Sequence, residues 1–502
     1  MSAELDTAYR APVAGAPVAG APIVGDAMAT PERALRPATA GASLSAVGLA
    51  CVLIGVLLPM VDFFIVNVAL ASIDQDLHAS APLLELVVSA YATAYALLLV
   101  VGGRLGDSFG RRRLFLAGMA AFAITSAACG LAPSAITLVA ARAAQGASAT
   151  LMVPQVLATI QSATAGQQRA RALARYGATG GIAAVIGQLL GGLLVSANLD
   201  GTGWRPIFLV NVPIGIAGFV LARRYMPVTR AAVAARVDGP GTLLLGVLVL
   251  TLLIPLTEGR SLHWPAWAIV LLAASPAVAA ALTVVEARAE RAGRIPFVPP
   301  SLIRLPTMRQ GLTLALPFFA GFGAFMFCYP LAVQQGLGAS PLAAGAGLVP
   351  MAAAFLLASL WTSRLVARFG PRVLTAGAAV QAAGLLILGG TVLAWWPGLP
   401  IAALGPGLAL AGLGQGLVMS PLFGVVLSDV PPSSAGVGGG VLATTQQTAL
   451  ALGVATLGSL FLALAGDGAG AGNAFLTVLA IQACVAVFVA AGALRLPDRR
   501  TR

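Results

Sequence analysis

Residues 45–70 read SAVGLACVLIGVLLPMVDFFIVNVAL, an apolar stretch whose one acidic residue is Asp62 and which holds no basic residue. A helix needs about 20 such residues to cross the hydrocarbon core of a bilayer. Apolar stretches of this length recur along the chain and predict a bundle of membrane-crossing helices. We predict fourteen, at 45–70, 83–102, 114–132, 136–158, 173–196, 206–225, 241–257, 266–285, 311–332, 344–362, 373–394, 400–420, 440–465 and 474–494.

The composition excludes most other classes of protein. Of 502 residues, 59% are hydrophobic and 9% are charged, whereas a soluble domain carries about 25% charged residues. Length alone would allow about three soluble domains. The hydrophobicity instead predicts one polytopic membrane protein of the all-α class, because helices satisfy their own backbone hydrogen bonds inside a bilayer.

The basic residues are all arginine, and the chain holds no lysine among its 29 basic side chains. Without lysine, neither a lysine-containing phosphate-binding loop nor Schiff-base catalysis is possible. The four cysteines stand singly in apolar stretches and the two histidines are far apart, so the sequence indicates no zinc site and no disulfide framework. We expect no metal, no cofactor, no nucleotide and no catalytic cluster, and we expect that the protein is not an enzyme.

The arginines also predict which helix ends face the cytoplasm. All but three of the 29 arginines fall on one side of the fourteen-helix arrangement. The exceptions are Arg142, which lies inside a stretch, and Arg205 and Arg260, which lie on the other side. Because arginine-rich loops stay on the cytoplasmic side, both termini are predicted to be cytoplasmic. Membrane topology thus explains the net charge of +12, and nucleic-acid binding is not expected.

The longest hydrophilic connections, at 226–240 and 286–310, separate six predicted helices, a pair and six more. Two six-helix halves are typical of secondary transporters that bind substrate near the midplane between the halves. The Ala- and Pro-rich start of the chain cannot form a core. The predicted organisation is a disordered cytoplasmic tail (1–43), an N-terminal six-helix bundle (44–226), two inserted helices with their loops (227–309), a C-terminal six-helix bundle (310–494) and a cytoplasmic tail (495–502).

Several motifs in consistent order resemble one family. They are GRLGDSFGRRR at 103–113, RAAQG at 142–146, DFFIVNVAL at 62–70, WRPIFLVNVPIG at 204–215, GASPLAAG at 338–345 and the segment 430–453. Together they resemble the fourteen-helix drug/proton antiporters of the major facilitator superfamily. The resemblance implies two six-helix bundles plus two extra helices (14 in total), and proton-coupled export of drugs or antibiotics by alternating access across a bacterial inner membrane.

The chain departs from this family pattern at two places. The first helix reads VDFF at 61–64 where the family has an L-D-x-T pattern. In the fifth helix Gly187, Gly191 and Gly192 follow the antiporter motif, but Gln188 stands where the family has a proline. Strict antiport depends on that proline if it seals the exporter against leak. The simplest role of the glycines is close helix packing.

Asp62 is the predicted proton carrier, and it is also a candidate anchor for a cationic substrate. A carboxylate deep in a membrane helix costs about 2.5–3.5 kcal/mol on insertion scales, so it marks a functional site. At a rise of about 1.5 Å per residue, Asp62 lies roughly 12 Å and Arg142 roughly 9 Å from the outer ends of their helices. Arg142 is therefore the predicted partner. The alternatives are a purely structural ion pair and, for Arg142, a hydrogen-bond donor that holds the bundle together.

The segment 103–113 is the predicted conformational gate, because its glycines permit a tight turn and Asp107 can cap a helix or pair with Arg372. The alternative is that its arginines only fix the topology. The predicted gate residues are Gly103, Asp107, Gly110, Arg111, Arg112 and Arg372.

A substrate cavity is predicted from aromatic and amide side chains. Four aromatic residues of the ninth helix share one helical face and would bind a flat lipophilic cation by stacking and cation–π attraction. Such a stripe is alternatively lipid-facing or part of the core. The candidates are Phe318, Phe322, Phe325 and Tyr329 from the stripe, with Gln145 and Gln415; Gln188, Gln446 and Gln447 are further polar candidates.

Asp62 is the one acid predicted at depth, and a single carboxylate favours monovalent cationic or neutral substrates over divalent cations. The predicted function is proton-coupled export of a small lipophilic compound by a monomer. The alternatives are a dedicated exporter of one endogenous metabolite and a proton-coupled importer. A membrane enzyme would need a cluster of His, Cys and carboxylate side chains, and the sequence shows no such grouping.

Overall fold

The computed structural model describes residues 44–79, 81–198, 201–228, 239–259, 262–293, 296, 299–431, 435–466 and 470–496. The predicted tail 1–43 and residues 497–502 lie outside the described residues. Over the described ranges every regular element is a helix and none is a strand. The all-α prediction is therefore confirmed.

The helices before residue 292 are α1 (Ala46–Leu77), α2 (Ala81–Phe109), α3 (Arg111–Gly130), α4 (Ala135–Ala163), α5 (Gly166–Ala197), α6 (Pro206–Leu209), α7 (Asn211–Tyr225), α8 (Gly239–Glu258) and α9 (Ala266–Arg291). The later helices are α10 (Pro300–Arg304), α11 (Pro306–Leu331), α12 (Pro341–Gly347), α13 (Val349–Phe369), α14 (Arg372–Trp395), α15 (Gly405–Val426), α16 (Ala435–Gly453), α17 (Ser459–Gly466) and α18 (Gly470–Ala493). Two π-helical turns, Ala332–Gly336 and Val454–Gly458, continue α11 and α16, and Ile401–Leu404 is a 3₁₀ turn.

Within the described residues, thirteen helical segments are long and apolar enough to cross a membrane. The remaining predicted stretch, 83–102, lies in α2, where Leu86–Leu99 forms a shorter apolar helix. The chain is a multi-pass membrane protein. Side-chain caps define several helix starts: the Ser45 hydroxyl accepts from the amide of Gly48 at 3.0 Å, and Ser134 and Thr137 form a reciprocal capping box at the start of α4.

The predicted loop at 103–113 is wrong in its extent. Helix α2 continues to Phe109, α3 begins at Arg111, and only Gly110 stands between them. Gly110 has a φ of 96°, a left-handed conformation that glycine adopts without a steric penalty. An apolar stretch measures the part of a helix inside the membrane, and backbone hydrogen bonding carries α2 beyond that part.

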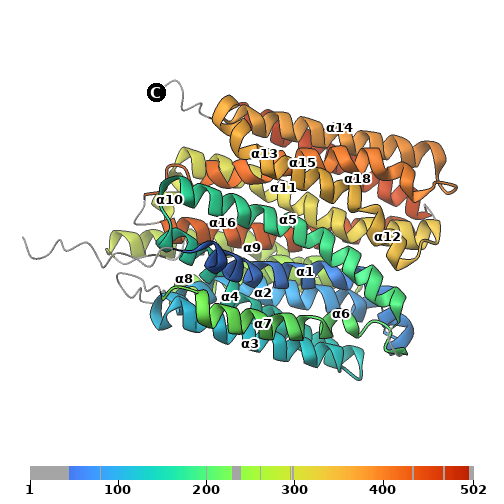
Figure 1. The fold of residues 1–502 in the computed structure, drawn as a ribbon, viewed down its shortest axis with the longest axis horizontal. Helices are drawn as coiled ribbons and strands as arrows, with labels where there is room; N and C mark the ends of the chain where they lie inside the picture. The colour runs from blue at the N-terminus through green and yellow to red at the C-terminus, as the bar shows by residue number, and fades with distance from the viewer. Residues whose placement is uncertain are drawn as a thin grey trace, which may run out of the picture. The chain divides into compact units, whose positions relative to one another are not determined.

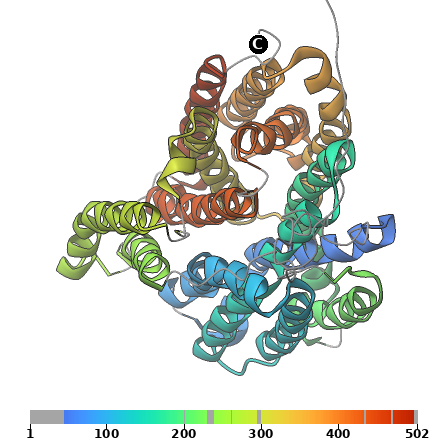
Figure 2. The ribbon, with the colours of Figure 1, turned by 90° about the vertical axis from the view of Figure 1, so that its left-hand side faces the viewer.

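The long helices run side by side in alternating directions (Figure 1). Helices α1–α7, the N-terminal helices, pack mainly on one another, as do α11–α18, the C-terminal helices. Figure 2 shows these groups in its lower and upper parts, with α8 and α9 side by side at the edge. Helix α9 contains the least buried of the thirteen spans, with 17% of its most apolar stretch buried.

The two groups meet where α5 packs against α12, α13 and α15, where α2 and α4 pack against α16, and where α1 packs against α11. Glycines allow the closest of these approaches. A Cβ on Gly192 would lie 2.9 Å from the Cα of Leu342, and a Cβ on Gly345 would lie 2.7 Å from the carbonyl oxygen of Gln188. Any side chain at these two positions would force α5 and α12 apart.

Candidate functional site

A fully buried carboxylate lies among the N-terminal helices. Oδ2 of Asp62 accepts a hydrogen bond from Nη1 of Arg142 at 2.5 Å, and both side chains are 0% exposed. Oδ1 accepts from Nε2 of Gln145 at 2.9 Å and from Nδ2 of Asn211 at 2.6 Å. Helices α1, α4 and α7 therefore meet at one acidic group, which has three donors around it.

Arg142 is fixed by contacts beyond the ion pair. Its Nε donates to the carbonyl oxygen of Val87 in α2 at 3.1 Å, and its Cζ lies 4.3 Å from the centre of the Tyr91 ring. Tyr91 in turn donates its hydroxyl to the carbonyl of Pro59 at 2.9 Å. Nη2 of Arg142 has no hydrogen-bond partner among the described residues. The guanidinium thus keeps one free donor beside the carboxylate.

Gln145 extends the network into α3. Its Nε2 also donates to the hydroxyl of Ser126 at 2.7 Å, while its Oε1 accepts from Arg142 at 2.7 Å and from the Cys129 thiol at 3.4 Å. The predicted role of Gln145 was in a substrate cavity, but the structure places it in the carboxylate network. A network in which the carboxylate and the amide are fully engaged can hold a charge inside the bundle, and protonation of Asp62 would remove that charge.

Sequence reasoning assigned no role to Asn211, Ser126 or Tyr91. Asn211 lies in the quoted motif at 204–215, and it is a polar residue within an apolar stretch. Because buried polar groups are paired, that position was a usable signal. Ser126 and Tyr91 give no comparable signal, since serine and tyrosine are common in membrane helices.

The predicted gate residues are only partly brought together. Nη1 of Arg111 donates to the carbonyl of Ala158 in α4 at 2.9 Å, and Nη2 of Arg112 donates to the carbonyl of Arg223 at the end of α7. Arg372 is exposed at the first residue of α14. The side chain of Asp107 lies outside the described residues, so its pairing with Arg372 stays a prediction.

Gly103 lies inside α2, where the predicted turn is absent. A Cβ at Gly103 would meet only the Cβ of Pro154, at 3.6 Å, which is ordinary contact. Gly106, one turn later, faces the side chain of Gln155 directly, and Nε2 of Gln155 donates to the carbonyl of Gly102 at 2.8 Å. Of the glycines in this segment, Gly106 is therefore the one that the packing of α2 against α4 requires.

Gln188, the departure from the family pattern, joins the two groups of helices. Its side chain is 0% exposed, and Nε2 donates to the carbonyl oxygen of Met326 in α11 at 2.7 Å. Pro330, four residues after Met326, has no N–H to donate to that carbonyl. The glutamine amide therefore satisfies a backbone acceptor that the proline leaves without its helical partner.

The glycines beside Gln188 pack α5 against α1. A Cβ on Gly187 would lie 2.6 Å from the carbonyl oxygen of Val61, and a Cβ on Gly191 would lie 2.8 Å from that of Ile65. These distances are far below ordinary contact, so no larger residue fits. Close packing, the simplest role of these glycines, is what the structure supports.

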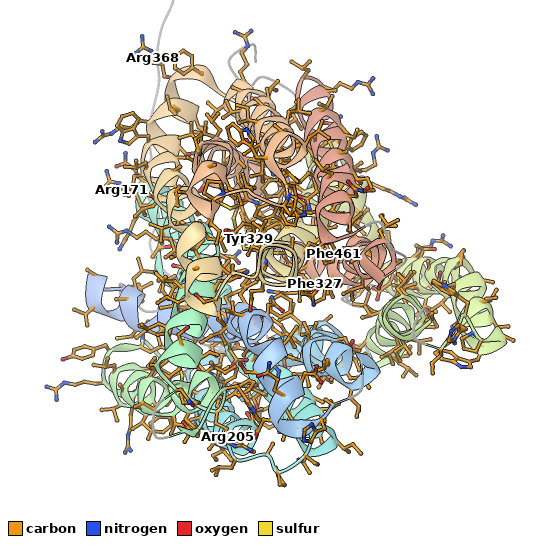
Figure 3. The ribbon with its side chains drawn as sticks, turned by 90° about the vertical axis from the view of Figure 1, so that its right-hand side faces the viewer. Arg171, Arg205, Phe327, Tyr329, Arg368 and Phe461 are labelled. Atoms are coloured by element: carbon orange, nitrogen blue, oxygen red, sulfur yellow. The ribbon has the colours of Figure 1, made fainter. Side chains whose placement is uncertain are left out.

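All four residues of the aromatic stripe are buried, which excludes a lipid-facing stripe. Phe322 and Phe325 line a small pocket together with Gln415. Phe318 instead packs on Phe319, with ring centres 5.1 Å apart, and Tyr329 stacks on Phe325 at 5.8 Å. Tyr329 lies near the middle of the view in Figure 3, among the helices.

The aromatic residues continue across the contact between the two groups. The Phe322 ring lies 5.7 Å from that of Phe64, which lies 4.9 Å from that of Phe63. Phe63 lines a second small pocket between α2 and α16. Close by, Nε2 of Gln447 donates to the Tyr95 hydroxyl at 3.4 Å.

An exposed ion pair joins α1 to the start of α6. Nη1 of Arg205 donates to Oδ2 of Asp76 at 2.5 Å, and Nε1 of Trp204 donates to the same oxygen at 2.9 Å. The side chains of Arg205 and Asp76 are 29% and 44% exposed. These two hydrogen bonds, the one from Arg205 first, hold the pKa of Asp76 below its ordinary value of 3.8.

Comparison with known proteins decides the family. The family model described as Major Facilitator Superfamily matches residues 52–454. The chain belongs to the Major Facilitator Superfamily. Among superfamily members, it is 37% identical to the "Probable actinorhodin transporter" of Streptomyces coelicolor, over 82% of this chain and 71% of that protein. It is 32% identical to the "Multidrug resistance protein Stp" of Mycobacterium tuberculosis, over 82% of this chain and 74% of that protein.

Solved structures of the superfamily share the fold. The human organic anion transporter MFSD10 (TETRAN) matches with a TM-score of 0.60 and 18% identity, covering 88% of this chain and 99% of that chain. A transporter of the POT family in complex with 5-aminolevulinic acid matches with a TM-score of 0.63 and 12% identity, covering 90% of this chain and 97% of that chain. At these identities the likeness concerns the fold alone.

Proposed function

We propose that the protein is a secondary transporter of the Major Facilitator Superfamily that exports a small lipophilic compound, monovalent cationic or neutral, in exchange for protons. The observation that carries the proposal is the buried carboxylate of Asp62 with its three donors. An ionisable group at this depth is costly to keep. The names of the relatives, an antibiotic transporter and a multidrug resistance protein, support export as the direction.

The proton site would work through the partners of Asp62. In the charged form the carboxylate binds Arg142, Gln145 and Asn211 and ties α1 to α4 and α7. A proton on Asp62 would weaken the attraction to Arg142, whose Nη2 is already unpartnered among the described residues. Proton binding and release would thereby change how tightly the N-terminal helices hold together, which is the coupling that alternating access needs.

The remaining organisation follows the sequence predictions. We place the protein in the bacterial inner membrane as a monomer with both termini cytoplasmic, and we assign residues 44–226 and 310–494 to the two six-helix bundles. The segment 103–113, through Arg111 and Arg112, would act as the cytoplasmic gate. Small lipophilic substrate, protons and the bilayer are the proposed partners.

A second candidate is a dedicated exporter of one compound. Three relatives are each named after a single compound: "Probable actinorhodin transporter", "Methylenomycin A resistance protein" and "Puromycin resistance protein pur8". Resistance of expressing cells to one compound, and not to a panel of lipophilic dyes, would favour this candidate. Uptake under the same proton gradient would instead favour an importer.

The test is dye transport in inverted membrane vesicles with an imposed proton gradient. We expect wild-type vesicles to accumulate a monovalent lipophilic dye, and Asp62→Asn to abolish gradient-dependent accumulation, because asparagine cannot exchange the proton. Asp76→Asn is the matched control, since it removes a carboxylate from an ion pair of the same 2.5 Å length at an exposed position. Full transport by Asp62→Asn would mean that the coupled proton binds at another residue.

A further inference from the structure

The amide of Asn211 uses only half of its hydrogen-bonding capacity at the carboxylate site. Its Nδ2 donates to Oδ1 of Asp62 at 2.6 Å, and its side chain is 1% exposed. Its own amide oxygen is buried and has no hydrogen-bond partner among the described residues. Since buried polar groups are almost always paired, we expect this oxygen to find its partner in another state of the site.

Gln145, the second amide at the same oxygen of Asp62, is held in its present orientation. Its Oε1 accepts from Nη1 of Arg142 at 2.7 Å, and its Nε2 also donates to the hydroxyl of Ser126 at 2.7 Å. Turning this amide would bring Nε2 against the guanidinium, which has donors and no acceptor. Asn211 has no such second bond among the described residues, so its amide turns without breaking one.

The two oxygens of Asp62 differ in how well they hold a proton. Oδ2 faces Nη1 of Arg142 at 2.5 Å, so a proton there would lie beside a positive charge that offers it no acceptor. Oδ1 faces the two amides. A proton on Oδ1 needs an acceptor, and the oxygen of Asn211 becomes that acceptor when its amide turns about the Cβ–Cγ bond.

The ionisable side chains that face Asp62 leave this task to Asn211. They are Arg142 from α4, Tyr91 from α2 and Cys129 from α3. The hydroxyl of Tyr91 and the thiol of Cys129 each donate to another group. The other helices packed on α1 place no ionisable side chain against Asp62 among the described residues.

We propose that Asn211 is the positioning residue for the proton on Asp62: its Nδ2 donates to the charged carboxylate, and its turned oxygen accepts the hydrogen bond of the protonated one. The inference rests on the proposed proton-coupled function and adds a residue to that site. The proton comes from water and returns to water, with an O–H bond formed at Oδ1 of Asp62 on binding and broken on release. Asn211 gives up no proton and reverses only the direction of one hydrogen bond.

The turning amide makes the response to a proton unequal among the helices. Protonation of Asp62 removes its charge attraction to Arg142, which loosens α1 from α4. The hydrogen bond to Asn211 persists in the reversed direction, so α1 stays joined to α7. Proton binding therefore weakens one contact of α1 and preserves another, which defines the helix pair that separates.

The first test is infrared spectroscopy of the purified full-length protein, labelled with carbon-13 at the side-chain carbonyl of asparagine. The chain has four asparagines, at 67, 198, 211 and 473. A carbonyl that gains a hydrogen bond absorbs at lower frequency, so acidification should shift one labelled band downwards. We expect the shift to be absent in Asn211→Leu and in Asp62→Asn, because each variant lacks one partner of the new hydrogen bond.

Asn67→Leu is the matched control for this measurement. Asn67 lies on α1, is 2% exposed, and also has an amide oxygen without a hydrogen-bond partner among the described residues. No hydrogen bond joins its side chain to Asp62 within the same ranges. The downward shift should therefore persist in Asn67→Leu.

The second test separates the proton step from substrate movement in inverted vesicles, with ethidium as a monovalent lipophilic probe. Gradient-driven uptake requires a proton on Asp62, whereas counterflow of labelled against unlabelled ethidium needs no net proton movement. We expect Asn211→Leu to lower uptake about tenfold or more, the factor for one hydrogen bond to a charged group, and counterflow to fall much less. Asn211→Thr should recover part of the uptake, because its hydroxyl both donates and accepts.

Three outcomes would overturn the inference or its basis, and they are distinguishable. A labelled band that does not move in the wild type would mean that the amide does not turn. Equal losses of uptake and counterflow in Asn211→Leu would mean that Asn211 only packs α7 against α1, and the proposed function would stand. Absence of gradient-driven ethidium uptake by the wild type would contradict the proposed function itself, while the infrared shift tests the turning amide without any substrate.

Discussion

The carboxylate site among the N-terminal helices and the pocket of Gln381, Gln415 and Gln482 among the C-terminal helices (the glutamine pocket) use residues at equal distances along their helices. Gln145 lies ten residues after the start of α4 at Ala135, and Gln415 lies ten residues after the start of α15 at Gly405. Asp62 lies sixteen residues after the start of α1 at Ala46, and Phe322 lies sixteen residues after the start of α11 at Pro306. One side therefore has a charge where the other has an aromatic ring.

The difference shows two ways of placing polar groups in a membrane protein. On the N-terminal side every oxygen of Asp62 is hydrogen-bonded, which is what a buried charge requires. The pocket on the C-terminal side is lined by no charged residue, and the amide nitrogen of Gln482 has no hydrogen-bond partner among the described residues. The first arrangement holds a charge inside the bundle, whereas the second holds only uncharged amides.

The largest loss of stability is expected from removing one partner of the buried ion pair and leaving the other. Arg142→Met would leave the carboxylate of Asp62 buried without its counter-ion, and such a loss costs about 3–5 kcal/mol of stability. Thermal unfolding of the purified protein measures it. The double variant Asp62→Asn with Arg142→Met should recover much of the loss, and Gln415→Leu in the glutamine pocket should cost almost nothing.

An Arg142→Met protein as stable as the wild type would contradict this reading of the comparison. It would mean that Asp62 is already protonated in the resting protein, so that the carboxylate site holds no negative charge.

A smaller effect is expected at the bond between the two groups of helices. Gln188→Leu removes the donor to the Met326 carbonyl, and we expect a loss of about 1 kcal/mol. In a Pro330→Ala background the carbonyl regains a helical N–H, so the same change should cost much less. Thermal unfolding of the wild type, Gln188→Leu, Pro330→Ala and the double variant measures how strongly the two substitutions depend on each other. Equal losses in both backgrounds would mean that Pro330 is not the reason for the glutamine.

The smallest effect is expected at the exposed ion pair of Asp76 and Arg205. It matches the buried pair in length, 2.5 Å in both, so it isolates the effect of burial. Asp76→Asn should cost less than about 1 kcal/mol. The pKa of Asp76 is lowered below 3.8, so its contribution is present above that pH and is lost as pH falls through the lowered value.

The measurement is the Tm of wild type and Asp76→Asn as a function of pH. The two curves should run parallel at neutral pH and converge in acid, as the pH falls below 3.8. A difference that instead disappears between about pH 5 and 7 would assign the titration to another group.

The sequence predicted the depth of the carboxylate site well because helical rise is constant. Asp62 and Arg142 were placed at similar depths by counting residues, and the structure has them in contact. Counting residues gives the depth of a side chain but not the direction in which its helix turns it, so the sequence predicts a substrate-cavity role for Gln145. Residues three apart on a helix share a face, and that rule alone would have placed Gln145 beside Arg142.

The glutamine pocket was less predictable, because it depends on how separate helices face one another. Gln381 and Gln482 lie in apolar stretches whose hydropathy is the same whichever way the helix is turned. The ends of helices were also poorly predicted. Apolar stretches found the membrane-buried parts, whereas α1 continues to Leu77 and α2 to Phe109, because backbone hydrogen bonding does not depend on side-chain hydropathy.

The joint of α2 and α3 has a consequence for how the protein is made. Only Gly110 separates the two helices, and α3 opens with three arginines, Arg111–Arg113. Positive charges at a helix N-terminus oppose its dipole, so these arginines do not stabilise α3 itself. During biosynthesis a one-residue connection is too short for α2 to enter the bilayer separately from α3. We expect the two to insert together as a hairpin while the arginines keep its tip in the cytoplasm.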